Sequence, residues 1–305
     1  MATFMERLED KWDQGKYTCV GLDPVGEKLP EEFRKYALLA GDNPAYLTLQ
    51  YLPAMLRVVH ATKHLAACYK PNWAFFLSGG YMGLLQLEEL LKFIRAETYV
   101  PVILDFKEGD IGDTMKKYGE AAFDALGADA VTVPPYLGFE ATKPVLSRSD
   151  KGVFVLCRTS NPGAGEFQDL EVNLTDKRCS QIFLGQPIGD DNKGFSIPKQ
   201  MPLYQYVAWQ VANTRAWNFN RNCGLVVGAT YPEELQAIRK IAPRIPLLLP
   251  GFGKQGGDVE RSVAAAGDRF LANSSSGICL AEDPGAAALA FHNQVNEARA
   301  LRSLR

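Results

Sequence analysis

Short apolar runs alternate with longer amphipathic segments along most of the chain. Eight of these runs are rich in branched or aromatic residues and end in polar ones, at residues 17–22, 66–70, 101–106, 130–133, 152–158, 224–227, 246–249 and 269–273. Several of them are apolar throughout rather than alternating between apolar and polar positions. This pattern predicts parallel strands that are covered on both faces.

Segments with a helical period of apolar residues separate these strands, at residues 46–63, 81–97, 114–126, 203–220, 232–241, 259–266 and 284–302. The segment from Pro232 begins with a proline and two acidic residues, as helix N-termini often do. The repeated alternation predicts an α/β protein, a single-domain (β/α)8 TIM barrel over residues 1–305. An open doubly wound sheet is the alternative, but no G-x-G-x-x-G follows the first strand.

Two long connections interrupt this alternation. Residues 161–200 follow the fifth strand and are rich in Gly, Pro, Asn and Asp. A loop of this length in a compact domain is usually functional or mobile, so we expect an insertion or lid over the carboxyl-terminal face of the barrel. Residues 23–43 follow the first strand and should lie on the same face.

The composition of the chain indicates which partners and which cellular compartment to expect. The net charge is −2 and no run is rich in Lys or Arg, which argues against a nucleic-acid partner. The six cysteines contain no C-x-x-C pair and read as free thiols in a reducing compartment. No apolar stretch reaches the roughly 20 residues of a membrane span, and the N-terminus lacks a signal-peptide pattern. We therefore expect a cytoplasmic protein with no membrane association.

Residues 100–114 carry the most informative local pattern, an apolar run that ends in Asp105, Lys107 and Asp110. Side chains alternate faces along a strand, so Asp105 and Lys107 should point the same way. Asp110 follows past a glycine, near the expected start of a helix. Burying such charges is costly unless they pair. The pattern therefore indicates solvated surface charges, a buried ion-pair network or a catalytic site.

Polar residues also end the other predicted strands, and in a barrel these ends meet at one face. They include Asp23 after the first strand, Lys70 and Asn72 at the second, and Arg158-Thr159-Ser160-Asn161 at the fifth. Glycine-rich segments follow the last two strands, at residues 250–257 and 273–277. Glycines let backbone N–H groups approach an anion, and barrels commonly bind phosphate at these two positions. A phosphorylated small molecule is the expected ligand.

With these residues assembled, the chain resembles the orotidine 5′-phosphate decarboxylase family over roughly residues 17–278, in its longer bacterial and protozoan-type branch. The family motif D-x-K-x-x-D-[IT] appears as Asp105, Lys107, Asp110 and Ile111. The segments G-L-D-P, K-P-N-x-A-F-F, R-T-S-N-P-G, V-V-G-A-T-Y-P and P-G-x-G-x-Q-G-G match as well. Related sugar-phosphate decarboxylases and aldolases share the first motif, so the other segments give the resemblance its specificity.

This resemblance implies decarboxylation of orotidine 5′-phosphate to uridine 5′-phosphate without a cofactor or a metal. Lys107 would protonate C6 of the pyrimidine, Asp105 would lie beside the substrate carboxylate, and Lys70 would complete an alternating array of lysines and aspartates. Asp110 would reach the site of the other subunit in a homodimer with shared active sites. The resemblance also implies substrate-binding positions at Asp23, Asn72 and Thr114 for the ribose region, Ser160 for the base, Gln255 for the phosphate side, and Ile111, Thr159, Pro250, Ser276 and Gly277, with Thr114 again coming from the partner.

One position departs from the family pattern. Ser276 stands where the family has an arginine that grips the phosphate, and a hydroxyl cannot replace a bidentate guanidinium. Lys254 could supply a substitute charge or point to solvent. Two alternatives therefore stay open beside the decarboxylase. A metal-dependent sugar-phosphate decarboxylase or aldolase would need an acidic ligand where Lys70 stands, and a non-catalytic phosphate-ligand binder would not need the set from Asp105 to Asp110.

Overall fold

The computed structural model describes residues 2–38, 48–174, 199–252 and 258–303. Eight strands form one sheet in the order β2-β1-β10-β9-β8-β5-β4-β3, and all of its paired neighbours are parallel. Their bounds are β1 Thr18–Leu22, β2 Ala66–Pro71, β3 Ile103–Leu104, β4 Ala130–Val133, β5 Gly152–Arg158, β8 Cys223–Val227, β9 Leu247–Leu249 and β10 Phe270–Ser274. Parallel bridges from Tyr69 to Val102 and from Asn72 to Asp105 join the two outer strands. The sheet therefore closes into the predicted (β/α)8 barrel, and the open sheet is excluded.

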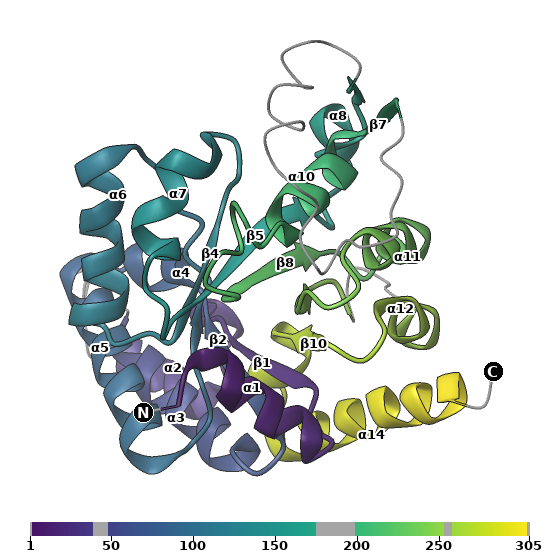
Figure 1. Cartoon of the computed structure of the whole chain (residues 1–305). Coiled ribbons are helices and arrows are strands. Elements are labelled where there is room, and N and C mark those ends of the chain that lie inside the picture. Colours follow the sequence, from purple (N-terminus) through teal and green to yellow (C-terminus); the bar gives the residue numbers. More distant parts are fainter. Residues whose placement is uncertain (1, 39–47, 175–198, 253–257, 304–305) are drawn as a thin grey trace.

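Helices surround the strands (Figure 1). Their bounds are α1 Phe4–Asp13, α2 Glu31–Leu38, α3 Tyr51–Thr62, α4 Trp73–Leu77, α5 Gly80–Glu97, α6 Gly112–Gly119, α7 Gly138–Leu146, α8 Gly165–Gln168, α10 Leu203–Ala212, α11 Pro232–Ile241, α12 Val259–Ala266, α13 Ser276–Cys279 and α14 Pro284–Ser303. A π-helical turn over Glu120–Ala125 continues α6. Among the described residues, none of the helices combines the length and hydropathy needed to cross a membrane.

The connection after β5 contains more regular structure than the sequence pattern predicts. It begins with a short turn at Pro162–Ala164 and α8, and β6 Glu171–Asn173 then pairs antiparallel with β7 Gln200–Pro202. In Figure 1, α8, β7 and α10 lie together on one side of the barrel. Residues 175–198 lie outside the described part, so the role of the insertion as a lid stays a prediction. The connection after β1 likewise contains α2.

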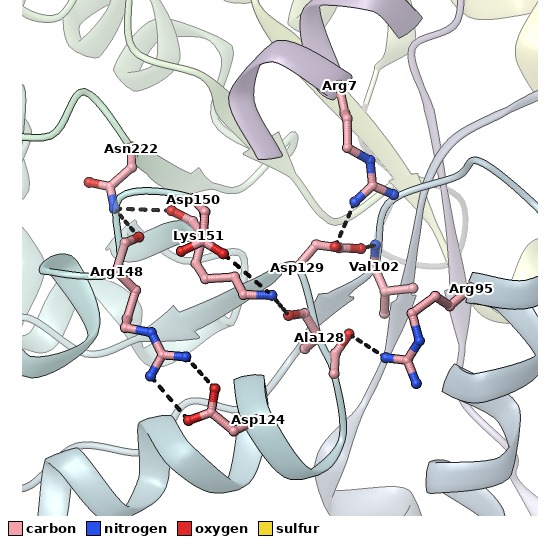
Figure 2. Close-up of polar contacts among 11 residues, drawn as sticks. Arg7, Arg95, Val102, Asp124, Ala128, Asp129, Arg148, Asp150, Lys151 and Asn222 are labelled. Atoms are coloured by element: carbon pink, nitrogen blue, oxygen red, sulfur yellow. Dashed lines mark hydrogen bonds and ion pairs between the residues drawn. The ribbon is translucent and has the colours of Figure 1, made fainter. Parts of the chain in front are cut away.

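Helix α1 covers the amino-terminal end of the barrel. Phe4 and Leu8 are fully buried there, and the Phe4 ring meets Phe154 of β5 edge-on, at 5.9 Å between centroids. Arg7 of α1 forms a 2.6 Å ion pair with Asp129, whose second carboxylate oxygen accepts the Val102 N–H at 2.8 Å (Figure 2). Because Asp129 precedes β4 and Val102 precedes β3, this contact ties α1 to the amino-terminal edge of the sheet.

Candidate active site

The centre of the candidate site is Asp105, immediately after β3 at the carboxyl-terminal rim. Its Oδ2 lies 2.7 Å from Nζ of Lys70, and its Oδ1 lies 2.5 Å from Nζ of Lys107. The Thr132 hydroxyl donates to the same Oδ1 at 2.9 Å. The side chains of Lys70 and Asp105 are only 6% and 10% exposed, whereas that of Lys107 is 48% exposed. The predicted meeting of Lys70, Asp105 and Lys107 is therefore present, with Lys107 on its open side.

Neighbouring charges keep Asp105 and Lys70 ionised in spite of their burial. Burial by itself would raise the pKa of Asp105, but the ammonium groups of Lys70 and Lys107 outweigh it and hold that pKa well below its ordinary value. Burial would likewise lower the pKa of Lys70, but the carboxylates of Asp105 and Asp23 outweigh it and raise that pKa. A fixed carboxylate between two ammonium groups is the result.

The backbone after β3 positions these charges by a route that simple strand alternation does not predict. The strand ends at Leu104, and Asp105 continues only as an isolated bridge whose N–H donates to the Pro71 carbonyl at 2.9 Å. Lys107 then has a φ of 53°, in the left-handed region that non-glycine residues rarely adopt. Its N–H donates to the Thr132 carbonyl at 2.9 Å, which holds this turn against β4.

Asp23 lies next to this cluster, one residue beyond β1. Burial raises the pKa of its carboxyl group, and the nearby Lys70 ammonium only partly opposes this effect. The nearby hydroxyl of Ser275, after β10, also works against the rise in the pKa of Asp23. Oδ1 of Asp23 has no hydrogen-bond partner among the described residues. A buried oxygen of this kind in a site is suited to accept a ligand hydroxyl.

The segment at the end of β5 is held in part by Gln168 and Asp169, two residues that the sequence pattern did not single out. Gln168 accepts the Thr159 N–H at 2.9 Å and donates from its amide nitrogen to the Thr159 hydroxyl at 2.9 Å. Arg158 is buried and pairs with Asp169 at 3.2 Å. Its guanidinium group also lies over the ring of Tyr231, in the loop after β8. The backbone of Ser160 passes so close to Gly228 that a Cβ there would lie 2.9 Å from the Ser160 Cα. The lack of a side chain at Gly228 therefore lets the backbone of Ser160 pack against the end of β8.

The other predicted binding residues lie on the same rim with varied surroundings. Asn72 follows β2 and caps α4, accepting the Ala74 N–H at 3.2 Å. Pro250 follows β9, and Ser276 and Gly277 begin α13 after β10. Gln255 and Lys254 lie outside the described residues, so neither the predicted phosphate contact nor the substitute charge is tested.

Asp110, Ile111 and Thr114 are not brought into the cluster around Asp105 within one chain. Asp110 accepts the Ile111 N–H at 2.7 Å and forms no ion pair with another described residue. Ile111 is 60% exposed, and Thr114 is exposed on α6. Within the described residues, none of the three forms an ion pair or a side-chain hydrogen bond with Lys70, Asp105 or Lys107.

Comparisons with known proteins agree with this geometry. Residues 17–202 match the orotidine 5′-phosphate decarboxylase / HUMPS family. An orotidine 5′-phosphate decarboxylase of Herpetosiphon aurantiacus is 39% identical over 279 residues, covering 91% of this chain and 90% of its own. One of Ralstonia pickettii is 39% identical over 310 residues and covers 97% and 99%.

Solved structures that resemble this chain also include orotidine monophosphate decarboxylases. The structure of Leishmania donovani OMP decarboxylase superposes with a TM-score of 0.75 at 32% identity, covering 97% of this chain and 98% of that one. A putative orotidine-monophosphate-decarboxylase from Toxoplasma gondii gives 0.78 at 34% identity and covers 98% and 97%. The UMP synthase of Leishmania donovani also matches, with a TM-score of 0.77 at 34% identity; 98% of this chain corresponds to 57% of that protein.

Proposed function

The chain belongs to the orotidine 5′-phosphate decarboxylase / HUMPS family, and we propose that it decarboxylates orotidine 5′-phosphate to uridine 5′-phosphate. The observation that carries this proposal is the ionised Asp105 held between the ammonium groups of Lys70 and Lys107. This array places two positive charges and one negative charge at the barrel rim. The named activity of the relatives supports the same substrate.

The proposed chemistry follows from the position of these charges. Losing carbon dioxide from the pyrimidine leaves negative charge at C6, with no electron sink such as a Schiff base among the proposed groups. The half-exposed Lys107 ammonium would stabilise this charge as it forms and then deliver a proton to the carbon. Asp105 would lie beside the substrate carboxylate. Binding energy from the remote phosphate would supply the rest of the barrier reduction.

Lys70 argues against a metal-dependent sugar-phosphate decarboxylase or aldolase. Such an enzyme would need an acidic ligand at the end of the second strand, where this chain has Lys70 with a raised pKa. An ammonium group that stays protonated cannot bind a cation. We therefore favour a reaction that needs no metal.

We further propose that two copies of the chain share their sites. Tyr136 and Ile111, in the loops after β4 and β3, are 91% and 60% exposed, and Leu137 beside Tyr136 is also exposed. Exposed apolar side chains beside a site are typical of a protein contact surface. In this arrangement Asp110 and Thr114 would enter the neighbouring barrel, because neither joins the charged centre of its own.

The substrate assignment is tested by incubating the purified chain with orotidine 5′-phosphate and following the loss of orotate absorbance, with and without a metal chelator. We expect turnover that the chelator leaves unchanged. Lys107→Ala should abolish turnover and keep the wild-type circular dichroism spectrum, and retained activity in this variant would remove Lys107 from its role. Wild-type protein that binds uridine 5′-phosphate without any turnover would favour a non-catalytic binder, and turnover that the chelator abolishes would favour the metal-dependent alternative.

A further inference from the structure

Thr132 lies at the centre of the contacts that hold the charged array together. It belongs to β4, beside the segment that carries Asp105 and Lys107, and is only 1% exposed. Its hydroxyl donates to Oδ1 of Asp105 at 2.9 Å. The hydroxyl oxygen of Thr132 also accepts the N–H groups of Phe106 at 3.1 Å and of Lys107 at 3.2 Å. One buried side chain therefore contacts three consecutive residues of the site.

The direction of these hydrogen bonds is fixed by chemistry. Backbone N–H groups can only donate, and an ionised carboxylate can only accept. The Thr132 hydroxyl has one proton to donate and two lone pairs to accept with, so its contacts use its full capacity. Without this hydroxyl, the Phe106 N–H would lose its acceptor and Oδ1 of Asp105 would lose one of its donors.

These contacts determine the orientation of both Asp105 and Lys107. The left-handed backbone of Lys107 is unfavourable for a residue with a Cβ and persists only where neighbouring groups hold it. Thr132 holds it twice, because both its carbonyl and its hydroxyl oxygen accept the Lys107 N–H. The Lys107 ammonium shares Oδ1 of Asp105 with the Thr132 hydroxyl. Moving that hydroxyl would therefore shift the carboxylate and the ammonium together.

We propose that Thr132 is a positioning residue that fixes Lys107 and Asp105 in their reactive arrangement. Packing alone does not call for a hydroxyl at this position, since the residues on either side in β4 are Val131 and Val133 and the whole strand is buried. A valine would have nearly the same shape and would keep the main-chain carbonyl contact. It would lack the three hydrogen bonds of the side chain. The inference rests on the proposed function, because it assigns Thr132 a role in that reaction.

The test compares Thr132→Val and Thr132→Ser with wild type, in kcat and KM for orotidine 5′-phosphate and in affinity for uridine 5′-phosphate. Thr62→Val is the matched control, because Thr62 is equally buried and its hydroxyl donates to the Val58 carbonyl at 2.7 Å, on α3. We expect Thr132→Val to lower kcat by about 10- to 100-fold, the usual effect of removing a group that orients a site residue. KM and nucleotide affinity should change little, Thr132→Ser should recover most of kcat, and Thr62→Val should keep it.

A Thr132→Val variant with wild-type kcat, or a loss that serine does not recover, would overturn the proposal. If wild-type protein shows no turnover, the proposed function fails, and crystal structures of wild type and Thr132→Val then decide on Thr132 alone. In the variant, Lys107 should leave the left-handed region and its Nζ should move out of hydrogen-bonding range of Asp105. An unchanged Lys107 backbone and ion pair would refute the positioning role.

Discussion

At the scale of single residues, the buried pair of Lys70 and Asp105 makes the candidate active site also a determinant of stability. Replacing Asp105 by asparagine keeps the shape but leaves the Lys70 ammonium without its nearest counter-charge. Breaking a buried pair on one side usually costs about 3–5 kcal/mol in the free energy of unfolding. We expect Asp105→Asn to show a loss of this size in denaturant unfolding at pH 7.

The difference in the free energy of unfolding between wild type and Asp105→Asn should also depend on pH. Because the pKa of Asp105 is lowered in the folded state, its ionisation stabilises the fold above the unfolded pKa of about 3.9. This stabilisation is lost as the pH falls below that value, toward the folded pKa. The stability gap between wild type and Asp105→Asn should therefore shrink below about pH 4. Asp110→Asn, which disrupts no ion pair among the described residues, is the control; an equal loss there would contradict the argument.

Ser276 is the residue at which this chain departs from the pattern of the family it resembles. An arginine there would add a bidentate, charge-assisted grip on the substrate phosphate. Ser276→Arg should lower KM for orotidine 5′-phosphate roughly tenfold or more, as expected for a charged hydrogen bond worth about 1.5–3 kcal/mol. Ser276→Lys should gain less, because an ammonium is only a point charge. Unchanged kcat and KM in both variants would place the phosphate elsewhere.

Some residues of the candidate site could be predicted from the sequence, and others could not. The charges of Asp105, Lys107 and Lys70 stand at the ends of apolar runs, where burial forces them to pair, so their meeting could be expected. Thr132 could not be singled out, because a threonine within a strand reads as an ordinary β-branched residue. Gln168 is the last residue of the short helix α8, which the sequence pattern did not predict, and only the fold brings it to Thr159. The left-handed turn at Lys107 also has no sequence signal.

At the scale of elements, the strands were easier to predict than the helices. Every residue of the barrel strands except Leu156 of β5 is buried, and seven of the eight apolar runs match the strand bounds to within one residue at each end. The third run, 101–106, is longer than β3, which spans only Ile103–Leu104. Helix α7 was missed because it begins at Gly138 and contains Pro144, two residues that usually interrupt a helix. Helix α10 ends at Ala212, although the apolar pattern continues to Asn220. There the buried Trp217 lies in a turn rather than in a helix.

Helix α1 can test whether the amino-terminal end of the barrel contributes to stability without contributing to catalysis. It covers the amino-terminal end, whereas the charged cluster lies at the carboxyl-terminal rim. Leu8→Ala should lower the free energy of unfolding by about 2–5 kcal/mol, because it opens a cavity in a fully buried position. Its kcat at 25 °C should match wild type, since the proposed site lies at the opposite end. Glu9→Ala on the same helix, which removes only a partly exposed ion pair, should change neither quantity appreciably.

At the scale of the whole molecule, the shared-site proposal makes a prediction that no single chain can satisfy. If each site combines Lys107 of one barrel with Asp110 of the other chain, Lys107→Ala and Asp110→Ala homodimers both lack a complete site. A heterodimer of the two variants contains one complete site, in the barrel that keeps Lys107. Heterodimers isolated through two different affinity tags should therefore recover about half of the wild-type activity per dimer.

The matched control pairs Lys107→Ala with Asp105→Asn. Both residues belong to the charged centre of one barrel, within a 2.5 Å ion pair. A heterodimer of these two variants has one barrel without the lysine and one without the carboxylate, so it should stay inactive. Recovery in the first heterodimer and not in the second would require Asp110 to act across the subunit boundary. Equal activity in the two heterodimers would instead mean that each barrel works with its own residues, and the exposed Tyr136 and Ile111 would need another partner.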